Sequence, residues 1–287
     1  MISIYKKELR SYFTTFTGYA FLGFFVLITG YFFAAQNLAA YSANYNDVLV
    51  STMIMFLILV PVLTMRSFAE ESRQKTDQLL MTSPITINAV VLGKFLAAVT
   101  LYLMGILITA VFPFILSKYG TVDVSATVCC FIGYFLMGSC LISVGIFISV
   151  LTDNQIVAAA GTFCVLFLLL MIDNIASGAP ITRASSLIFA GVIAAAVAAA
   201  VYTGTKSLAA SCIFALVGAA VIGICYLVSP TVFDGLITRS LGWLSELSRF
   251  ENFYLGVFGI SDVVYYITFS GVFLFLTVNS IEKRRWS

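Results

Sequence analysis

Long apolar runs recur along the whole chain, and they restrict its fold more than any other feature. A helix crosses the hydrocarbon core of a bilayer with roughly 20 mostly apolar residues. Eight runs meet this condition; they cover residues 18–35, 48–65, 87–116, 125–150, 156–173, 185–203, 207–228 and 262–280. Because 61% of the 287 residues are hydrophobic and 10% are charged, lipid must be the solvent of most of the surface. The sequence predicts an all-α, polytopic transmembrane helix bundle that forms a single domain over residues 1–287.

Lys and Arg are distributed unequally between the two sides of this predicted bundle. With eight spans, eleven of these 15 residues lie on the side of the termini and four lie on the other. Cytoplasmic segments of membrane proteins carry the excess of Lys and Arg. Both termini are therefore predicted to be cytoplasmic.

The segment before the first span has the pattern of an amphipathic helix. Basic residues occupy one face, and aromatic and apolar residues recur at helical spacing on the other. The apolar face consists of Tyr5, Leu9, Tyr12, Phe13 and Phe16. Helices of this kind lie in the membrane interface. Residues 1–17 are therefore predicted to form an interfacial helix, and a frayed cytoplasmic tail is the alternative.

Residues 229–261 are too polar to cross the membrane, yet they are rich in Phe, Leu, Trp and Tyr. Ile237, Leu241 and Leu244 belong to a set of apolar residues spaced three and four apart, and glycines interrupt the run. The pattern predicts two short amphipathic helices on the outer leaflet or dipping into it. Irregular backbone at that depth requires cover by protein or by a water-filled cavity. The segment would therefore form a lid or pack against a partner.

The residues that most enzymes need are missing. The chain has no histidine, its six cysteines show no metal-ligand spacing, and no G-x-S-x-G motif occurs. The Gly93–Lys94 pair is not a P-loop, because Asn88 stands where the first glycine is needed and Phe95 where Ser or Thr is needed. The sequence predicts a chain with no catalytic residues, no metal site and no nucleotide site of its own.

The distribution of acidic residues bears on the source of energy for any transport. All 13 acidic residues fall at or beyond the ends of the predicted spans. Ion-coupled transporters generally need ionisable or carbonyl-rich sites inside the membrane. An ion-coupled secondary transporter is therefore disfavoured, and the energy would come from a partner.

One polar segment stands out between the second and third apolar runs. In "SFAEESRQKTDQLLMTSP", residues 67–84, five charged residues fall within eight positions. Glu71 stands four residues before Lys75, and such pairs stabilise a solvated helix by about 0.2–0.5 kcal/mol each. We expect a short cytoplasmic helix over 67–82 that is rigidly joined to two spans. It would transmit force if a soluble partner bound it, and an ordinary loop helix is the alternative.

The stretch "PVLTMRSFAEESRQKTDQLLMTSPITINAVVLGKFLAA" resembles the loop between the second and third spans of type-2 ABC transporter permeases. The matching positions are Glu70, Glu71, Thr76, Leu79, Leu80, Thr82, Pro84, Gly93 and Lys94. The end of the chain, "FENFYLGVFGISDVVYYITFSGVFLFLTVNSIEKRRW", resembles the closing hairpin and last span of one branch of that family. This branch includes the permeases associated with gliding motility and with nitrous-oxide-reductase maturation.

The resemblance implies a membrane subunit that forms a homodimer or a heterodimer and binds two copies of a cytoplasmic ABC ATPase. ATP and magnesium would bind in that partner, and no cofactor would bind in this chain. The loop over 66–86 would be a coupling helix that enters a cleft of the ATPase. Its contact residues would be Glu70, Glu71, Arg73, Lys75, Thr76, Asp77, Leu79 and Leu80. The interfacial helix would lie beside it, and an extracellular re-entrant hairpin would include Phe233, Leu236, Leu244, Phe250 and Phe253.

The sequence departs from the family pattern in two respects. Lys75 stands where the family commonly has glycine, which would alter the fit to the ATPase, and Asp77 replaces a glutamate. Family members usually have six spans, whereas residues 185–228 add two. The alanine-rich run at 185–203 could instead be a surface helix, but an even number of added spans keeps the basic C-terminus inside. The predicted order is interfacial helix (1–17), spans one and two (18–65), coupling loop (66–86), spans three to five (87–173), added pair (185–228), hairpin (229–261) and last span (262–280).

These observations lead to the hypothesis that the chain is the permease subunit of an ATP-driven ABC exporter in the bacterial inner membrane. Its partners would be the ATPase, a second permease chain and the lipid bilayer, but no nucleic acid, and it would not itself be an enzyme. A hypothesis of a different class is a non-transporting scaffold that passes ATPase motion to envelope partners through the hairpin. Loss of an envelope partner in a hairpin variant that keeps ATPase activity would favour the scaffold. An ion-coupled secondary transporter would instead depend on an ion gradient.

Overall fold

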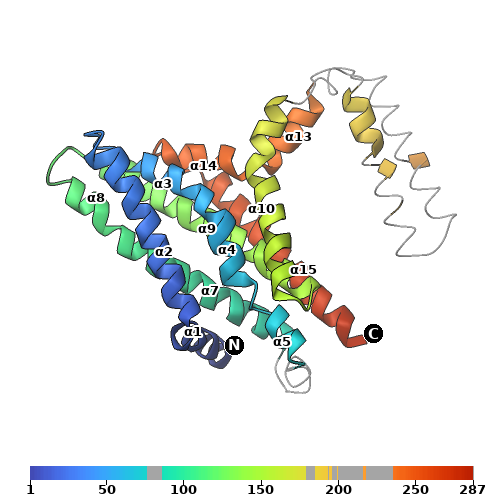
Figure 1. Cartoon of the computed structure of the whole chain (residues 1–287). Coiled ribbons are helices and arrows are strands. Elements are labelled where there is room, and N and C mark those ends of the chain that lie inside the picture. The colour runs from blue at the N-terminus through green and yellow to red at the C-terminus, as the bar shows by residue number, and fades with distance from the viewer. Residues whose placement is uncertain are drawn as a thin grey trace. The chain divides into compact units, whose positions relative to one another are not determined.

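The structure, a computed structural model, describes residues 1–75, 86–178, 185–192, 194–195, 199, 216–217 and 235–286. Every regular element in these ranges is a helix, and none is a strand (Figure 1). The helices include α1 (Ile2–Thr14), α2 (Phe16–Phe33), α3 (Asn46–Thr52), α4 (Phe56–Thr64), α5 (Ala69–Arg73), α7 (Ile87–Thr109), α8 (Val111–Leu116), α9 (Val124–Leu151), α10 (Gln155–Gly178), α13 (Leu236–Leu244), α14 (Glu246–Tyr254) and α15 (Ile260–Trp286). A π-helical stretch, Ala34–Leu38, extends α2, and a 3-10 turn, Met53–Met55, joins α3 to α4. The prediction of an all-α chain is confirmed for the residues described.

Six helical stretches among the described residues are long and apolar enough to cross a membrane. They are Phe16–Leu38, Asn46–Arg73, Ile87–Leu116, Val124–Leu151, Gln155–Gly178 and Ile260–Lys283. Each begins within two residues of the start predicted for one of the apolar runs. Six of the eight predicted spans are therefore found. Of the other two, 185–203 is helical over 185–192 and lies only partly outside the described residues, whereas 207–228 lies almost entirely outside them.

Two compact units divide the chain. Unit 1 comprises Met1–Leu168 and Arg249–Ser287, and unit 2 comprises Leu169–Ser248. Unit 1 thus holds α1 to α9, α15 and most of α10 and α14. Unit 2 holds the end of α10 and α13, which are tied by a hydrogen bond of 2.6 Å from Ser245 Oγ to Asp173 Oδ2.

Helix α9 forms the centre of unit 1, where it packs against α3, α4, α5, α7 and α15. Two of its glycines let neighbouring helices approach closely. A Cβ atom at Gly138 would overlap the ring of Tyr102 of α7, and one at Gly145 would overlap the side chain of Thr64 of α4. The buried hydroxyl of Tyr102 donates to the carbonyl of Tyr134 at 2.7 Å, so its polar atom is satisfied. In lipid no hydrophobic driving force acts between helices, so close van der Waals packing holds them together, and small residues allow that close approach.

The first helix is shorter than the predicted interfacial helix over 1–17. It ends before Thr15, whose backbone is extended (φ −96°, ψ 158°), and α2 begins at Phe16. Phe16 therefore belongs to the first span, and its assignment to the interfacial helix is wrong. Helix α1 packs along α7, with the Tyr5 hydroxyl 3.1 Å from Thr100 Oγ1. In Figure 1, α1 and α5 lie at one end of unit 1, and α3 and α8 lie at the other.

Candidate functional site

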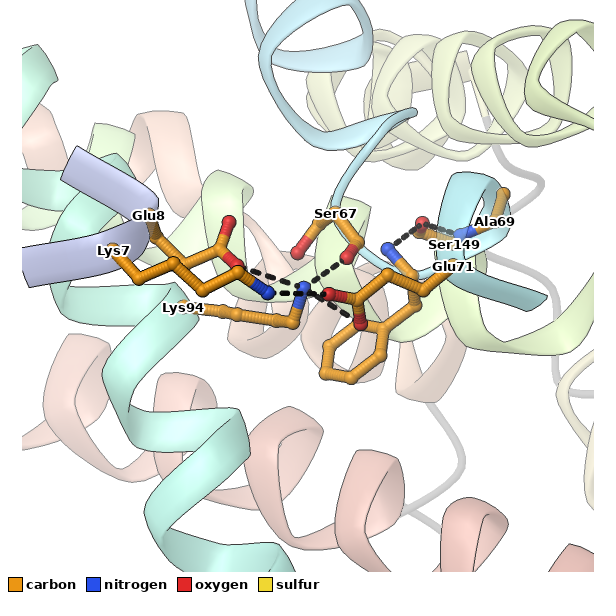
Figure 2. Close-up of polar contacts among 8 residues, drawn as sticks. Lys7, Glu8, Ser67, Ala69, Glu71, Lys94 and Ser149 are labelled. Atoms are coloured by element: carbon orange, nitrogen blue, oxygen red, sulfur yellow. Dashed lines mark hydrogen bonds and ion pairs between the residues drawn. The ribbon is translucent and has the colours of Figure 1, made fainter. Parts of the chain in front are cut away.

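Lys94 is a charged residue buried in an apolar helix. It lies about two turns into α7, and 3% of its side chain is exposed. Its ammonium is 3.0 Å from Glu71 Oε2 and 3.3 Å from Glu8 Oε1, and it also donates to the carbonyl of Ser67 (Figure 2). Burial of an ammonium is costly unless it is paired and hydrogen-bonded, and these three oxygens meet that need. The charge of Lys94 therefore joins α1, α7 and α5 with the turn before it.

A second cation completes what we call the Lys94 cluster, which consists of Lys7, Glu8, Ser67, Glu71 and Lys94. Lys7 Nζ lies 3.6 Å from Glu71 Oε1 and 4.0 Å from Glu8 Oε1. Both carboxylates thus lie between two cations, and the four charges cancel. Lys7 is 67% exposed, so solvent screens its pairs, whereas the pairs of Lys94 are shielded from water. Lys94 is therefore the cation that holds the cluster together.

The first turn of α5 is fixed to α9 by one hydroxyl. Ser149 Oγ accepts hydrogen bonds from the backbone N–H groups of Phe68 at 3.1 Å and Ala69 at 3.2 Å. Such N–H groups at the start of a helix have no partner within the helix, and Phe68 at the N-cap position has no side chain that could accept from them. The Phe68 ring lies against Lys94, with 4.8 Å between Nζ and the ring centroid. The start of α5 is therefore tied to α9 and to the Lys94 cluster at once (Figure 2).

Helix α5 ends at Arg73, well before the predicted end of the charged helix. The backbone of Lys75 is left-handed, with φ of 56°, and this conformation stops a helix. The predicted pair between Glu71 and Lys75 is wrong, because Glu71 faces Lys94 instead. Arg73, Gln74 and Lys75 are exposed. The remaining predicted coupling residues, Thr76, Asp77, Leu79 and Leu80, lie outside the described residues.

A polar pocket of about 330 Å³ opens beside the Lys94 cluster, between α1, the start of α2, and α5 with the turn before it. In its wall, Arg66 Nε lies 3.6 Å from Glu70 Oε2, and Arg66 Nη1 donates to Thr17 Oγ1 at 3.0 Å. Burial, with a smaller contribution from Glu8, raises the pKa of Tyr12 above its ordinary value, so this phenol stays neutral. The pocket therefore combines basic, acidic and neutral hydroxyl groups in one space.

The apolar face predicted for α1 is partly covered by unit 1. Its residues Tyr5, Leu9, Tyr12 and Phe13 are all half-buried. The Phe13 ring meets the Tyr19 ring edge-on at 5.8 Å, and Tyr12 lines the polar pocket. The remaining surface of this face is open to the surroundings, as an interfacial helix requires.

Aromatic residues anchor the other end of unit 1. Phe250 and Phe253 of α14 are buried, and Phe253 lies directly on α9 at Gly133. A Cβ atom at Gly133 would lie 2.5 Å from the Phe253 ring, so only glycine leaves room for it. The Tyr254 hydroxyl donates to Asp47 Oδ1 at 2.7 Å. This hydrogen bond, and then burial, raises the pKa of Tyr254.

An ion pair fixes α14 to the start of α15 at the same end. Arg249 Nη1 lies 3.3 Å from Asp262 Oδ1, and Asn252 donates to Asp262 Oδ2 at 2.9 Å. The Arg249 guanidinium also lies 4.2 Å from the centroid of the Tyr265 ring. We call this set of residues the Phe253 anchor; it consists of Asp47, Gly133, Arg249, Phe253, Tyr254 and Asp262.

The predicted hairpin is divided between the two units. Phe250 and Phe253 belong to unit 1, and both are buried. Leu236 and Leu244 of α13 belong to unit 2, where Leu236 is half-buried and Leu244 is exposed. Phe233 lies outside the described residues.

A family model described as "ABC-2 family transporter protein" matches residues 34–224, which is 191 of the 287 residues. The chain belongs to the ABC-2 transporter family. It is therefore a permease subunit of an ABC transporter, a kind of membrane component that is generally not catalytic itself. The six apolar helices make this ABC-2 permease a multi-pass membrane protein. A comparison with curated proteins finds no match.

The matched range of this ABC-2 permease includes α5, Lys94 and Ser149, but not α1. Sequence reasoning placed Glu71 in the coupling loop and missed Glu8, Lys94 and Ser149 as members of the site. Lys94 did carry a signal, because an ionisable residue inside an apolar run calls for a buried partner. Glu8 and Ser149 carried none, because their partners come from helices that are distant in the sequence.

Proposed function

We propose that this ABC-2 permease is the transmembrane subunit of an ATP-driven exporter in the bacterial inner membrane, with both termini in the cytoplasm. Two copies of a separate ABC ATPase would bind ATP and magnesium, and a second permease chain would complete the transport path. The resemblance of the C-terminal segment supports placing it in the branch with the permeases of gliding motility and nitrous-oxide-reductase maturation. In this arrangement the Lys94 cluster faces the cytoplasm, and α5 with the residues after it contacts the ATPase.

The observation that carries this proposal is the contrast between the two ends of α5. Its start is held by Ser149 and by the Lys94 cluster, and its end presents Arg73, Gln74 and Lys75 to solvent. A short polar helix that is held at one end and exposed at the other can receive a push from a soluble partner. The predicted contact residues Thr76, Asp77, Leu79 and Leu80 follow directly in the sequence.

Glu71 would transmit a displacement of α5 to the membrane spans. Closure of the ATPase dimer would displace α5 and with it Glu71, which shares Lys94 of α7 with Glu8 of α1. The bonds to Ser149 would carry the same displacement to α9. Interactions of charged groups are stronger in a low dielectric than in water, so the shielded Lys94 pairs resist stretching more than exposed pairs do. The motion of one short helix is therefore shared by α1, α7 and α9.

A second function, the scaffold that acts on envelope partners, is favoured by one observation at the other end of unit 1. Directly after α14, Leu255, Val257 and Phe258 expose apolar side chains. In a scaffold these residues would bind an envelope protein, and the motion of the ATPase would reach it without any flux of substrate.

Affinity purification from native membranes, with mass spectrometry of the copurifying proteins, tests the proposal. A change at Glu71 would disturb the Lys94 cluster itself, so the test variant must alter exposed side chains only. The variant is Arg73→Glu combined with Lys75→Glu. The matched control reverses two exposed cations elsewhere, Lys118→Glu combined with Arg239→Glu.

We expect an ABC ATPase to copurify with the unchanged chain and with the control, and to be lost from the Arg73→Glu, Lys75→Glu variant. An unchanged chain that retains no ATPase, or a variant that retains it fully, would contradict the proposal. A Phe258→Asp variant that keeps the ATPase but loses an envelope protein would decide in favour of the scaffold.

A further inference from the structure

The polar pocket beside the Lys94 cluster lies at the level where two membrane spans end. Its wall includes Thr15 and Thr17, which flank the first residue of the span Phe16–Leu38. It also includes Arg66, which comes directly after the helix α4 and its C-cap and lies close to the end of the span Asn46–Arg73. Lipid headgroups occupy the zone just outside the hydrocarbon core. A pocket at this level is therefore open to the headgroups of the surrounding lipids.

The charges that line the pocket are balanced. Three basic and three acidic side chains contribute to it: Lys7, Arg66, Lys94, Glu8, Glu70 and Glu71. A ligand with only negative charge would meet the three carboxylates, and one with only positive charge would meet the three cations. A ligand that carries a phosphate and an ammonium in one headgroup can pair with both sets.

The groups at the mouth of the pocket can receive such a ligand. Arg66 is 43% exposed and has five N–H donors, of which the contacts with Thr17 and Glu70 engage two. An arginine fork matches the oxygens of a phosphate, and the exposed Lys7 adds a second cation nearby. The half-exposed carboxylate of Glu70 can accept hydrogen bonds from an ammonium.

The size of the pocket and its surroundings fit a headgroup whose acyl chains stay outside. Its volume of about 330 Å³ is near the lower limit of the roughly 300–1,000 Å³ of ligand pockets, so it holds a headgroup but not two acyl chains. Next to it, Phe16 is 83% exposed and Tyr19 is 59% exposed. Exposed aromatic residues at the end of a span are typical of the headgroup zone. The exposed face of α2 continues through Phe24 and Leu27, where acyl chains can lie.

We propose that this pocket binds the headgroup of a zwitterionic aminophospholipid, of which phosphatidylethanolamine is the simplest. The phosphate pairs with Arg66 and Lys7, the ammonium pairs with Glu70, and the acyl chains lie along the exposed face of α2. The bound lipid bridges α1, α2 and the segment that leads into α5. The site belongs to this chain alone and is independent of whether the chain works as an exporter or as a scaffold.

Native mass spectrometry of the purified full chain in detergent measures this binding directly. The probes are phosphatidylethanolamine, phosphatidylglycerol and diacylglycerol with identical acyl chains, together with soluble glycerophosphoethanolamine. We expect phosphatidylethanolamine to bind more tightly than the other two lipids. Excess glycerophosphoethanolamine should not displace it, because the soluble headgroup lacks the contacts of the acyl chains with α2.

Two variants at the mouth of the pocket separate the two halves of the headgroup. Arg66→Gln removes the contact with the phosphate and should weaken the binding of phosphatidylethanolamine about tenfold, the usual effect of losing one charge-assisted hydrogen bond. Glu70→Gln should weaken it by a similar factor and improve the binding of phosphatidylglycerol, so that the preference narrows. The matched controls Arg239→Gln and Glu251→Gln change exposed residues outside the pocket and should bind as the unchanged chain does.

Thermal unfolding in the same detergent checks that the variants are folded. Thr17→Val is a milder change in the same wall, because it removes only the hydroxyl to which Arg66 donates. Equal binding of the two phospholipids, or unchanged binding in the folded Arg66→Gln and Glu70→Gln variants, would overturn the proposal. Displacement by glycerophosphoethanolamine would also overturn it and would leave a soluble phosphoamine as the ligand. Equal binding of diacylglycerol would overturn it by showing that the apolar face of α2 accounts for lipid retention.

Discussion

The Lys94 cluster with the Ser149 hydroxyl beside it, and the Phe253 anchor, hold neighbouring helices to α9 at two different levels, and they do so with different chemistry. The residues of α9 that they engage, Ser149 and Gly133, lie about 24 Å apart along the helix at 1.5 Å per residue. At the first level, alternating charges surround a pocket, and a single hydroxyl holds the start of α5. At the second, an aromatic ring fills the space that a glycine leaves free.

This difference indicates which end of unit 1 can respond to its surroundings. Charged groups can be re-paired by a partner or screened by ions, so the contacts at the Lys94 cluster can be altered without repacking the core. A ring packed against the backbone can leave only if the close-packed atoms around it move. We therefore expect the Lys94 end to adapt to partners and the Phe253 end to keep its geometry.

Replacement of Lys94 tests the charged end most severely. Lys94→Met leaves Glu8 and Glu71 partly buried without their principal cation, and loss of one partner of a buried ion pair costs about 3–5 kcal/mol. We expect the free energy of unfolding in detergent to fall by about 3 kcal/mol, since both carboxylates keep some exposure to water. Lys7→Met removes the exposed cation of the same cluster and should cost less than about 1 kcal/mol. Equal losses in the two variants would contradict the role assigned to Lys94.

Gly133→Ala tests the aromatic end. The added Cβ would lie 2.5 Å from the Phe253 ring, and overpacking of this kind costs about 1–3 kcal/mol. Gly23→Ala in α2 is the matched control, because nothing lies within 4 Å of its Cβ, and it should be neutral or stabilising. Combining Gly133→Ala with Phe253→Leu should recover part of the loss. Thermal unfolding of the three variants measures these effects, and a stable Gly133→Ala protein would show that the ring can move aside.

Tyr254→Phe removes a polar contact of the Phe253 anchor and should lower the free energy of unfolding by about 1–2 kcal/mol at neutral pH, because the bond goes to a carboxylate. The hydrogen bond to Asp47 raises the pKa of Tyr254 in the folded state above its unfolded value of about 10. Its contribution is therefore fully present below pH 10 and is lost as the pH rises through the raised pKa. The free energies of unfolding of the unchanged chain and of Tyr254→Phe should differ at pH 8. The difference between them should be smaller at pH 11. A difference that is the same at both pH values would exclude this hydrogen bond as its source.

Ser149→Ala should lower the free energy of unfolding by only about 1 kcal/mol, as expected for the loss of a helix cap. Its effect on the start of α5 should be more specific, because the N–H groups of Phe68 and Ala69 lose their acceptor. Hydrogen exchange of these two amides should accelerate in the variant. Ser139→Ala is the matched control in the same helix, since Ser139 bonds only within α9 to the carbonyl of Phe135. Unchanged exchange in Ser149→Ala would show that α5 is held by other contacts.

The spans could be predicted from the sequence because their physical cause is local. Each consists of enough adjacent apolar residues to cross the hydrocarbon core, and the predicted starts of six spans agree with the structure. The wrong assignment of Phe16 to the interfacial helix shows what helical periodicity cannot detect. Helical periodicity continues through Thr15, and only the extended backbone at that residue separates α1 from the first span.

The charged site could be predicted only in part, because its decisive contacts are not local. Within the loop, Glu71 has Lys75 as an acceptable partner four residues away, and the spacing favours that pair. Lys94 is shielded from water and needs a carboxylate more than the exposed Lys75 does, so the tertiary contact prevails. The hydroxyl that holds the start of α5 likewise comes from the far end of α9, and no pattern in the loop indicates it.

The glycines of α9 limit how unit 1 can move. Gly133, Gly138 and Gly145 each receive a side chain from a different neighbour, namely Phe253, Tyr102 and Thr64. Sliding α9 along its axis by even one residue, about 1.5 Å, would drive a side chain out of each of these gaps at the same moment. Translation of α9 is therefore blocked at all three glycines. A neighbouring helix can still tilt about the side chain that packs on its glycine, because that side chain stays in place. The neighbouring helices can therefore tilt against α9, but they cannot slide along it.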